Sequence, residues 1–176
     1  TFLSALRGPL RALDDGALSL RCAPLELEFE GVKPVGVSPS FVEVRSDDGD
    51  ADATVALMSA IDGVLFVADS RRERLRDNLV AWAWVLERLR GAKREDVPIV
   101  IALHRRAAPN SLPISDLDGA LGAGPHPRFE TERNNPGGML GAVVELVRRA
   151  AARAHPAVES LWTEWERGRF LGDNPD

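Results

Sequence analysis

The chain has 176 residues, of which 44% are hydrophobic, and this length and apolar content suit one domain with one core. Its 22 basic and 27 acidic residues give a net charge of −5 without a long block of either sign, so nucleic acid and anionic membranes are poor partners. The single cysteine, Cys22, excludes an intrachain disulfide and a four-cysteine zinc site. No apolar run is long enough to span a membrane and the start lacks a signal-peptide pattern, so we expect a cytoplasmic protein.

The first fifty residues show four successive patterns. Leucines spaced by three and four residues over 3–13 predict an opening helix. Alternation of apolar residues with Glu over 25–30 predicts a half-buried strand. Residues 35–44 remain apolar but contain Pro and Gly, which is typical of a broken or edge strand. The acidic stretch 46–52 predicts a loop.

The middle of the chain predicts a buried strand followed by an amphipathic helix. A short helix is expected over 55–61, and the continuous apolar run 64–68 is typical of a strand buried on both faces. Ser70 and Glu73 match a capping box, so we expect the next helix to begin there and to end near Gly91. Its apolar stripe is Leu75, Leu79, Trp82, Leu86 and Leu89.

The last third repeats the alternation of strand and helix. A second buried strand is expected over 97–103 and a short helix over 114–121. A weak segment near Phe129 has room for one more strand, and the final helix runs over 140–154. This order predicts an α/β fold with a mostly parallel sheet covered by helices on both faces.

Two regions carry tryptophans that point to contacts outside the core. Trp84 lies opposite the apolar stripe of its helix and is expected to face outward, covered either by a partner or by the tail. We divide the chain into a domain of residues 1–155 and a C-terminal helical extension of residues 156–176. The extension has an apolar face at helical spacing, and Trp84, Trp162 and Trp165 are the candidate partner-binding residues.

Three stretches resemble segments of the bacterial MglA-type GTPases, which are small Ras-like proteins. The run Asp62-Gly63-Val64-Leu65-Phe66-Val67-Ala68-Asp69-Ser70 resembles the family's fourth strand. The run 103–113 is similar to the segment that carries the guanine-reading N-K-x-D motif, and 135–140 is similar to the last base-contacting loop. The resemblance covers most of residues 20–155 and implies a Ras-like P-loop GTPase fold.

The guanine-reading motif is changed at each of its three positions. By resemblance, His104 stands at the Asn position, Arg105 at the Lys position and Ala107 at the Asp position. An alanine cannot accept the two hydrogen bonds that the Asp carboxylate receives from guanine, and each such bond is worth about 1.5–3 kcal/mol. We therefore expect guanine selectivity to be lost. His104 could stack on a base, but an ordinary solvated loop histidine is the favoured interpretation.

The phosphate-binding motif G-x-x-x-x-G-K-[ST] does not occur in the sequence. By resemblance, Thr1 stands just after the position of its lysine, and the first strand would lie in the middle of the sheet. We therefore expect upstream residues in the natural protein, and GTP or GDP with Mg²⁺ would be bound only if they carry a phosphate loop. Gly49, which stands at the second switch, is not followed by the Gln that orients water, so efficient hydrolysis is not expected.

Two hypotheses follow. The first is a GTPase-like interaction module, a pseudo-GTPase that binds a Roadblock/LC7-type regulator, another GTPase or a scaffold of a cell-polarity, gliding-motility or signalling system. The alternative is an active small GTPase whose phosphate loop lies upstream of Thr1. No catalytic residue is assigned, and no metal site is expected because no two histidines lie at ligand spacing on one helix face.

Overall fold

The computed structural model describes two parts of the chain. Residues 1–48 together with 151–176 form the first compact unit, and residues 49–150 form the second. The expected opening helix, Gly49 and the C-terminal extension lie outside the described residues, which are 19–21, 25–27, 35–37, 40–42, 51–132 and 136–154.

The described residues of the first unit form four short strands, in two antiparallel pairs. β1 (Ser19–Arg21) pairs with β4 (Ser40–Val42), and β2 (Leu25–Leu27) pairs with β3 (Val35–Val37). The strand expected at 25–30 is confirmed over its first three residues. The broken strand expected over 35–44 is found as β3 and β4, separated at residues that include Pro39. β1 was not predicted from the sequence.

The second unit is built on three parallel strands in the order β5-β6-β7. These are β5 (Val64–Asp69), β6 (Ile99–His104) and β7 (Arg128–Thr131). The expected α/β fold with a parallel sheet is therefore present, and β7 is the strand expected near Phe129. β6 lies in the middle, where its first five residues are buried as expected from their unbroken apolar sequence.

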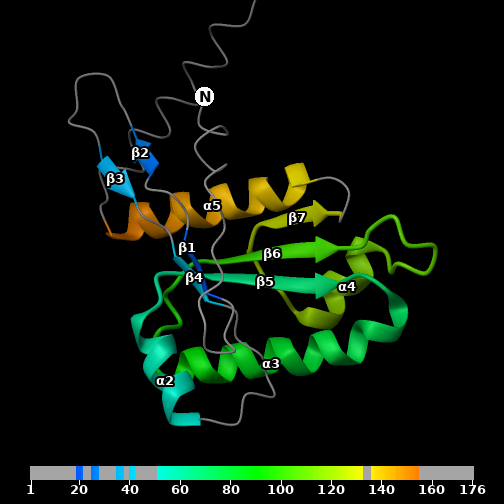
Figure 1. Cartoon of the computed structure of the whole chain (residues 1–176). Coiled ribbons are helices and arrows are strands. Elements are labelled where there is room, and N and C mark those ends of the chain that lie inside the picture. The colour runs from blue at the N-terminus through cyan, green and yellow to red at the C-terminus, as the bar shows by residue number, and fades with distance from the viewer. Residues whose placement is uncertain are drawn as a thin grey trace, which may run out of the picture. The chain divides into compact units, whose positions relative to one another are not determined.

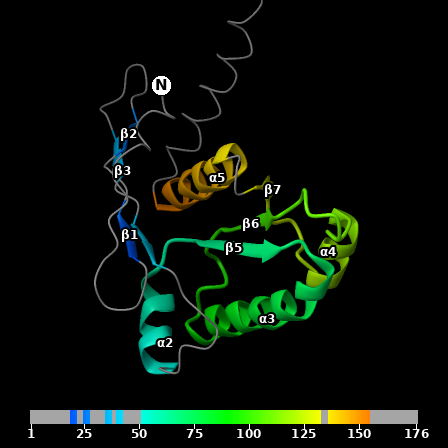
Figure 2. The same cartoon turned by 45° about the vertical axis from the view of Figure 1, so that its right-hand side comes forward.

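Helices cover both faces of this sheet (Figures 1 and 2). α3 (Leu75–Gly91) and α4 (Ile114–Leu121) lie on one face, and α5 (Pro136–Ala154) lies on the other. The expected helices at 114–121 and 140–154 are confirmed, although α5 begins at Pro136. α2 (Ala51–Ala60) precedes β5 and begins inside the stretch that was expected to be a loop.

Ring and glycine contacts show how the two helical layers pack on the strands. Phe66 of β5 meets Trp82 of α3 edge to face, with 4.9 Å between ring centroids. On the opposite face, Gly141 of α5 lies against Phe129, and a Cβ at this glycine would be 3.2 Å from the Phe129 ring. Residues that are aligned in neighbouring parallel strands point to the same face of the sheet. Phe66 is aligned with Ile101, and Phe129 is aligned with the next residue, Ala102. Phe66 and Phe129 therefore point to opposite faces, in agreement with their contacts to α3 and α5.

β5 has a neighbour on one side only among the described strands. The backbone N–H groups of Val64 and Ser70 donate to Pro98 O and His104 O, on the side of β6. Because the backbone groups of successive strand residues point in alternate directions, Leu65 and Val67 direct their N–H groups to the opposite side of β5. The side chain of Val67 is 50% exposed although the strand sequence is apolar on both faces. This edge of the sheet is therefore open in the described part of the chain.

The predicted capping box at Ser70 and Glu73 is wrong. A 3-10 turn, η1 (Arg72–Arg74), precedes α3, which begins at Leu75 without a side-chain cap. Ser70 instead continues the strand: its N–H donates to His104 O at 2.8 Å, and its carbonyl accepts from Leu112 N–H at 2.8 Å. Ser70 is fully buried in this position, and its hydroxyl makes no hydrogen bond to the start of the helix.

The apolar stripe expected along α3 is confirmed at Trp82 and Leu89, which are buried. Leu75, Leu79 and Leu86 are only partly buried, and a polar residue, Asn78, is buried on the same side of the helix.

No helix among the described residues is both long and apolar enough to cross a membrane.

Candidate functional site at the carboxyl edge of the sheet

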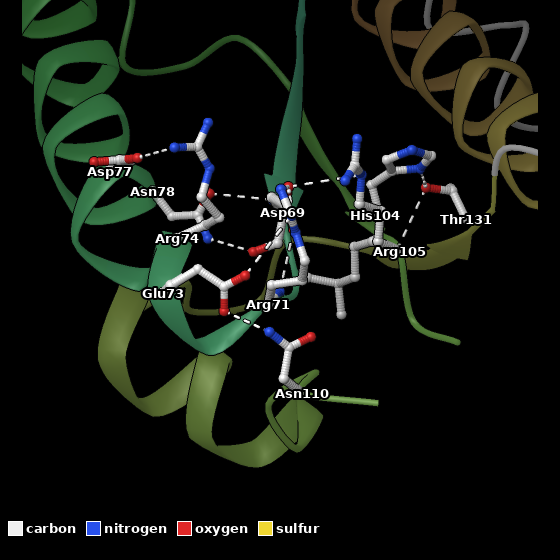
Figure 3. Close-up of polar contacts among 11 residues, drawn as sticks. Asp69, Arg71, Glu73, Arg74, Asp77, Asn78, His104, Arg105, Asn110 and Thr131 are labelled. Atoms are coloured by element: carbon white, nitrogen blue, oxygen red, sulfur yellow. Dashed lines mark hydrogen bonds and ion pairs between the residues drawn. The ribbon is translucent and has the colours of Figure 1, made fainter. Parts of the chain in front are cut away.

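The three parallel strands end side by side, and their last residues bring polar side chains together (Figure 3). Asp69 at the end of β5 is aligned with His104 at the end of β6, which is aligned with Thr131 at the end of β7. Ligands of open α/β sheets bind at this edge. It is therefore the first place to look for a functional site.

The Asp69 carboxylate is held by Arg71, two residues further along the chain. Its oxygens accept from Arg71 Nε at 3.0 and 3.2 Å, from Arg71 Nη2 at 2.7 Å and from the Arg71 backbone N–H at 3.1 Å. Arg105 Nε lies 3.8 Å from the same carboxylate. The hydrogen bond from the Arg71 side chain lowers the pKa of Asp69, so the pair stays ionised.

Asn78 of α3 fastens the end of β5 to the helix. Its side-chain oxygen accepts from Asp69 N–H at 3.1 Å, and its side-chain nitrogen donates to Asp69 O at 2.7 Å. Because both backbone groups of Asp69 point away from β6, the amide of Asn78 completes the hydrogen bonding that a further strand would otherwise supply. Asn78 is 6% exposed.

His104 is bonded to the neighbouring strand. Its Nδ1 lies 3.1 Å from the Thr131 hydroxyl, which in turn lies 3.4 Å from Leu103 O. If the hydroxyl donates to Leu103 O, its oxygen accepts from His104 Nδ1–H, which fixes that tautomer of the ring. His104 is the last residue of β6.

Arg105 begins the loop after β6 in a left-handed conformation, with φ of 62°. Its backbone N–H donates to Thr131 O at 3.0 Å, which continues the pairing of β6 with β7. The side chain, 49% exposed, leans toward Asp69 as Figure 3 shows. A non-glycine residue at positive φ costs on the order of 1 kcal/mol, so the loop is tightly constrained here.

Ala107 faces a carboxylate that comes from another element. Its backbone N–H donates to the side chain of Glu132, just after β7. The alanine itself carries no hydrogen-bond acceptor on its side chain. Each of the three positions His104, Arg105 and Ala107 is therefore engaged with residues of the edge itself.

The loop after Ala107 is also closed by its own contacts. Arg106 Nη1 donates to Leu112 O at 2.5 Å, and its Nε lies 3.3 Å from Glu130. Asn110 donates to Glu73 at 2.5 Å, which joins this loop to the start of α3. The carboxylates of Asp69, Glu73 and Glu132 thus all accept hydrogen bonds from neighbouring protein groups.

Of the other site residues expected from the sequence, the structure describes Trp84, which lies away from this edge. Trp84 is on α3, is partly buried, and carries the guanidinium of Arg88 over its ring at 5.6 Å from the centroid. Thr1, Trp162 and Trp165 lie outside the described residues. In the part of the chain that the structure describes, no three His, Cys, Asp or Glu side chains gather as a metal site.

Sequence reasoning missed three residues of this edge: Asn78, Thr131 and Glu132. Asn78 gave a signal, because it is a polar residue one position before Leu79 within an apolar stripe. Thr131 and Glu132 gave none, since their role depends on the pairing of β7 with β6.

The chain matches no model of a known protein family, and no curated protein matches it.

Proposed function

We propose that the chain is a GTPase-like protein-interaction module, a pseudo-GTPase of the MglA-like type that keeps a Ras-like α/β fold without reading guanine. The observation that carries the proposal is Ala107. It stands where a guanine-reading loop needs a carboxylate, and its own N–H is used by Glu132.

The polar groups around Ala107 support the same reading. Asp69 is neutralised by Arg71 and Arg105, and the ring of His104 is bonded to Thr131. A nucleotide base bound at this edge would have to displace these internal contacts. Displacing them costs free energy, because each hydrogen bond that is lost contributes about 0.5–1.5 kcal/mol.

The open edge of β5 supports the Ras-like part of the proposal. In a Ras-like sheet the first strand lies beside the strand that β5 resembles, and Leu65 and Val67 direct their backbone groups toward that side. A strand supplied by residues beyond those described would pair with these groups and cover Val67.

The proposed partners are a Roadblock/LC7-type regulator, another GTPase or a scaffold of a cytoplasmic cell-polarity, gliding-motility or signalling system. This part of the proposal comes from the resemblance. A partner is favoured over catalysis because the carboxylates of Asp69, Glu73 and Glu132 are held by neighbouring protein groups, while α3 exposes Val80.

Titration calorimetry with GTP and with ATP tests the loss of guanine recognition. We expect the two affinities to agree within about tenfold, or both nucleotides to fail to bind, because Ala107 cannot discriminate their bases. Where binding occurs, Ala107→Asp should shift the preference toward GTP, and Ala107→Ser is the control that adds a polar side chain without the charge. Tight GTP binding with no ATP binding in the unchanged chain would favour the alternative, an active small GTPase.

A further inference from the structure

The segment that joins α4 to β7 places a histidine against the core. His126 lies between the end of α4 at Leu121 and the start of β7 at Arg128. Its ring meets Trp82 of α3 edge to face, with 5.8 Å between ring centroids. Trp82 is only 4% exposed and also contacts Phe66 of β5. The histidine therefore belongs to the aromatic cluster that packs α3 on the sheet.

Arg128 fixes the backbone around this histidine. Its Nη1 donates to His126 O at 2.5 Å, and its Nη2 donates to Gly124 O at 2.9 Å. Its Nε donates to the carboxylate of Asp118 on α4 at 2.5 Å. One guanidinium therefore ties residues 122–127 to α4 and to β7, and sets the position from which the ring reaches α3.

The charges around the ring come from β7, α4 and α5. Arg128 of β7 and Arg149 of α5 bring positive charge. Each is paired with one carboxylate at 2.5 Å, Arg128 with Asp118 of α4 and Arg149 with Glu145 of α5. α3 contributes the indole of Trp82, whose Nε1–H is a donor and is buried without an acceptor. An apolar surface and two guanidinium groups favour the neutral form of an imidazole.

The titration of the ring follows from these surroundings. Burial lowers the pKa of His126 below its usual value, and the positive charges of Arg128 and Arg149 lower it further. Histidine is the side chain that ordinarily changes charge between pH 5 and 8. Acidification in this range therefore puts a charge on a ring that is packed as a neutral group.

The unfolded chain binds this proton more tightly than the folded chain, because an unfolded histidine titrates near pH 6.5. The stability that the neutral ring contributes is fully present above that pH. It is lost as the pH falls through the lowered pKa of the folded state, and below that pKa no further loss occurs. Each unit between the two pKa values changes the ratio of folded to unfolded protein about tenfold.

We propose that His126 is a pH-sensitive contact that couples the packing of α3 on the sheet to the protonation of one ring. When the ring is neutral, residues 122–127 lie against Trp82. When it is protonated, the ring leaves Trp82 and the contact between α3 and this segment loosens. The inference goes beyond the proposed interaction role and does not depend on nucleotide binding.

Urea unfolding of the full chain at pH 8 and at pH 5.5 tests the effect on stability. The unfolding midpoint should fall on acidification, and His126→Gln, which cannot be protonated, should remove part of that fall. His126→Lys is charged at both pH values, so at pH 8 it should be less stable than His126→Gln. His155→Gln is the matched control, because it removes one imidazole and leaves His126 in place. It should keep the part of the fall that His126 causes.

Nuclear magnetic resonance tests the contact itself. The ring signal that is missing in His126→Gln should titrate with a midpoint below about 6.5 in the unchanged chain. One of the four indole N–H signals should move with the same midpoint, and this movement should be absent in His126→Gln.

Three results would each overturn the proposal: a ring midpoint at or above about 6.5, equal pH dependence in the unchanged chain and His126→Gln, or no indole signal that follows the ring. The ring and indole titrations use the unchanged chain, so they decide the matter even if a variant does not fold. None of these outcomes alters the comparison of GTP with ATP.

Discussion

Asn78 decides how the end of β5 is held. Its amide bonds to both backbone groups of Asp69, and Asp69 in turn holds Arg71 with its carboxylate. One buried amide therefore connects α3, the edge of the sheet and the polar cluster at the candidate site.

Changing Asn78 to Ala should destabilise the protein by about 1–3 kcal/mol, because it leaves the N–H and C=O of Asp69 without partners. Asn110→Ala is the matched control. It removes an exposed amide that bonds only to Glu73, so its effect should stay within about 0.5 kcal/mol. Urea unfolding of both variants measures the difference. Equal effects would show that the Asn78 bonds do not contribute to stability.

At the residue scale, the sequence predicts which positions matter better than it predicts their contacts. His104, Arg105 and Ala107 could be placed after a buried strand, and they do lie at its carboxyl end. Their partners Asp69, Thr131 and Glu132 come from other strands, so the contacts form only once the register is set. The direction of Trp84 was predicted from helical periodicity, but the cover that Arg88 gives its ring was not.

The elements of the second unit follow closely from local pattern. β5 and β6 are apolar runs between polar residues, and α3 ends near Gly91 as expected. The start of α3 could not be predicted, because Ser70 satisfies the capping pattern but is drawn into the strand by bonds to His104 and Leu112. Tertiary hydrogen bonds replaced a local one in this case.

The first turn of α5 packs closely on β7, and a glycine makes this possible. A Cβ at Gly138 would overlap the carbonyl oxygen of Glu130, whereas one at Gly119 in α4 would meet nothing within 4 Å. Gly138 is therefore explained by helix-to-strand contact, independently of any ligand.

Gly138→Ala should destabilise the protein by about 1–3 kcal/mol, since either the helix or the strand must move. Gly119→Ala makes the same chemical change in a helix with free space and should stabilise by up to about 1 kcal/mol. Thermal unfolding should show opposite shifts, at about 2–4 °C per kcal/mol for a chain of this size. If both variants melted at the same temperature, α5 would not be held by this contact.

At the scale of the whole molecule, alternation of strand and helix is enough to predict a parallel sheet with helices on two faces. It does not predict the open side of β5, because a sequence of apolar residues such as 64–68 reads as a strand with two neighbours. The four short strands of the first unit were predicted only in part, since each is three residues long and carries little periodic signal.

We also predict, from the switch sequence and the sheet edge together, that the chain does not turn over GTP. Hydrolysis needs a metal ion on the phosphates and a side chain that orients water. The sequence has no Gln after Gly49, and the Asp69 carboxylate at the sheet edge is occupied by Arg71. Phosphate release at saturating GTP and Mg²⁺ should therefore equal the background without protein.

Asp69→Asn is the control for this measurement, because it removes the ionised carboxylate while keeping a side chain of the same shape. Phosphate release that is the same in this variant as in the unchanged chain, and that does not depend on protein concentration, is background. Sustained release that grows in proportion to protein, and above all a rate on the order of 1 per second, as in typical enzymes, would contradict the prediction. It would mean that groups beyond the described residues assemble a working site against this edge, despite the contacts that close Asp69, His104 and Ala107.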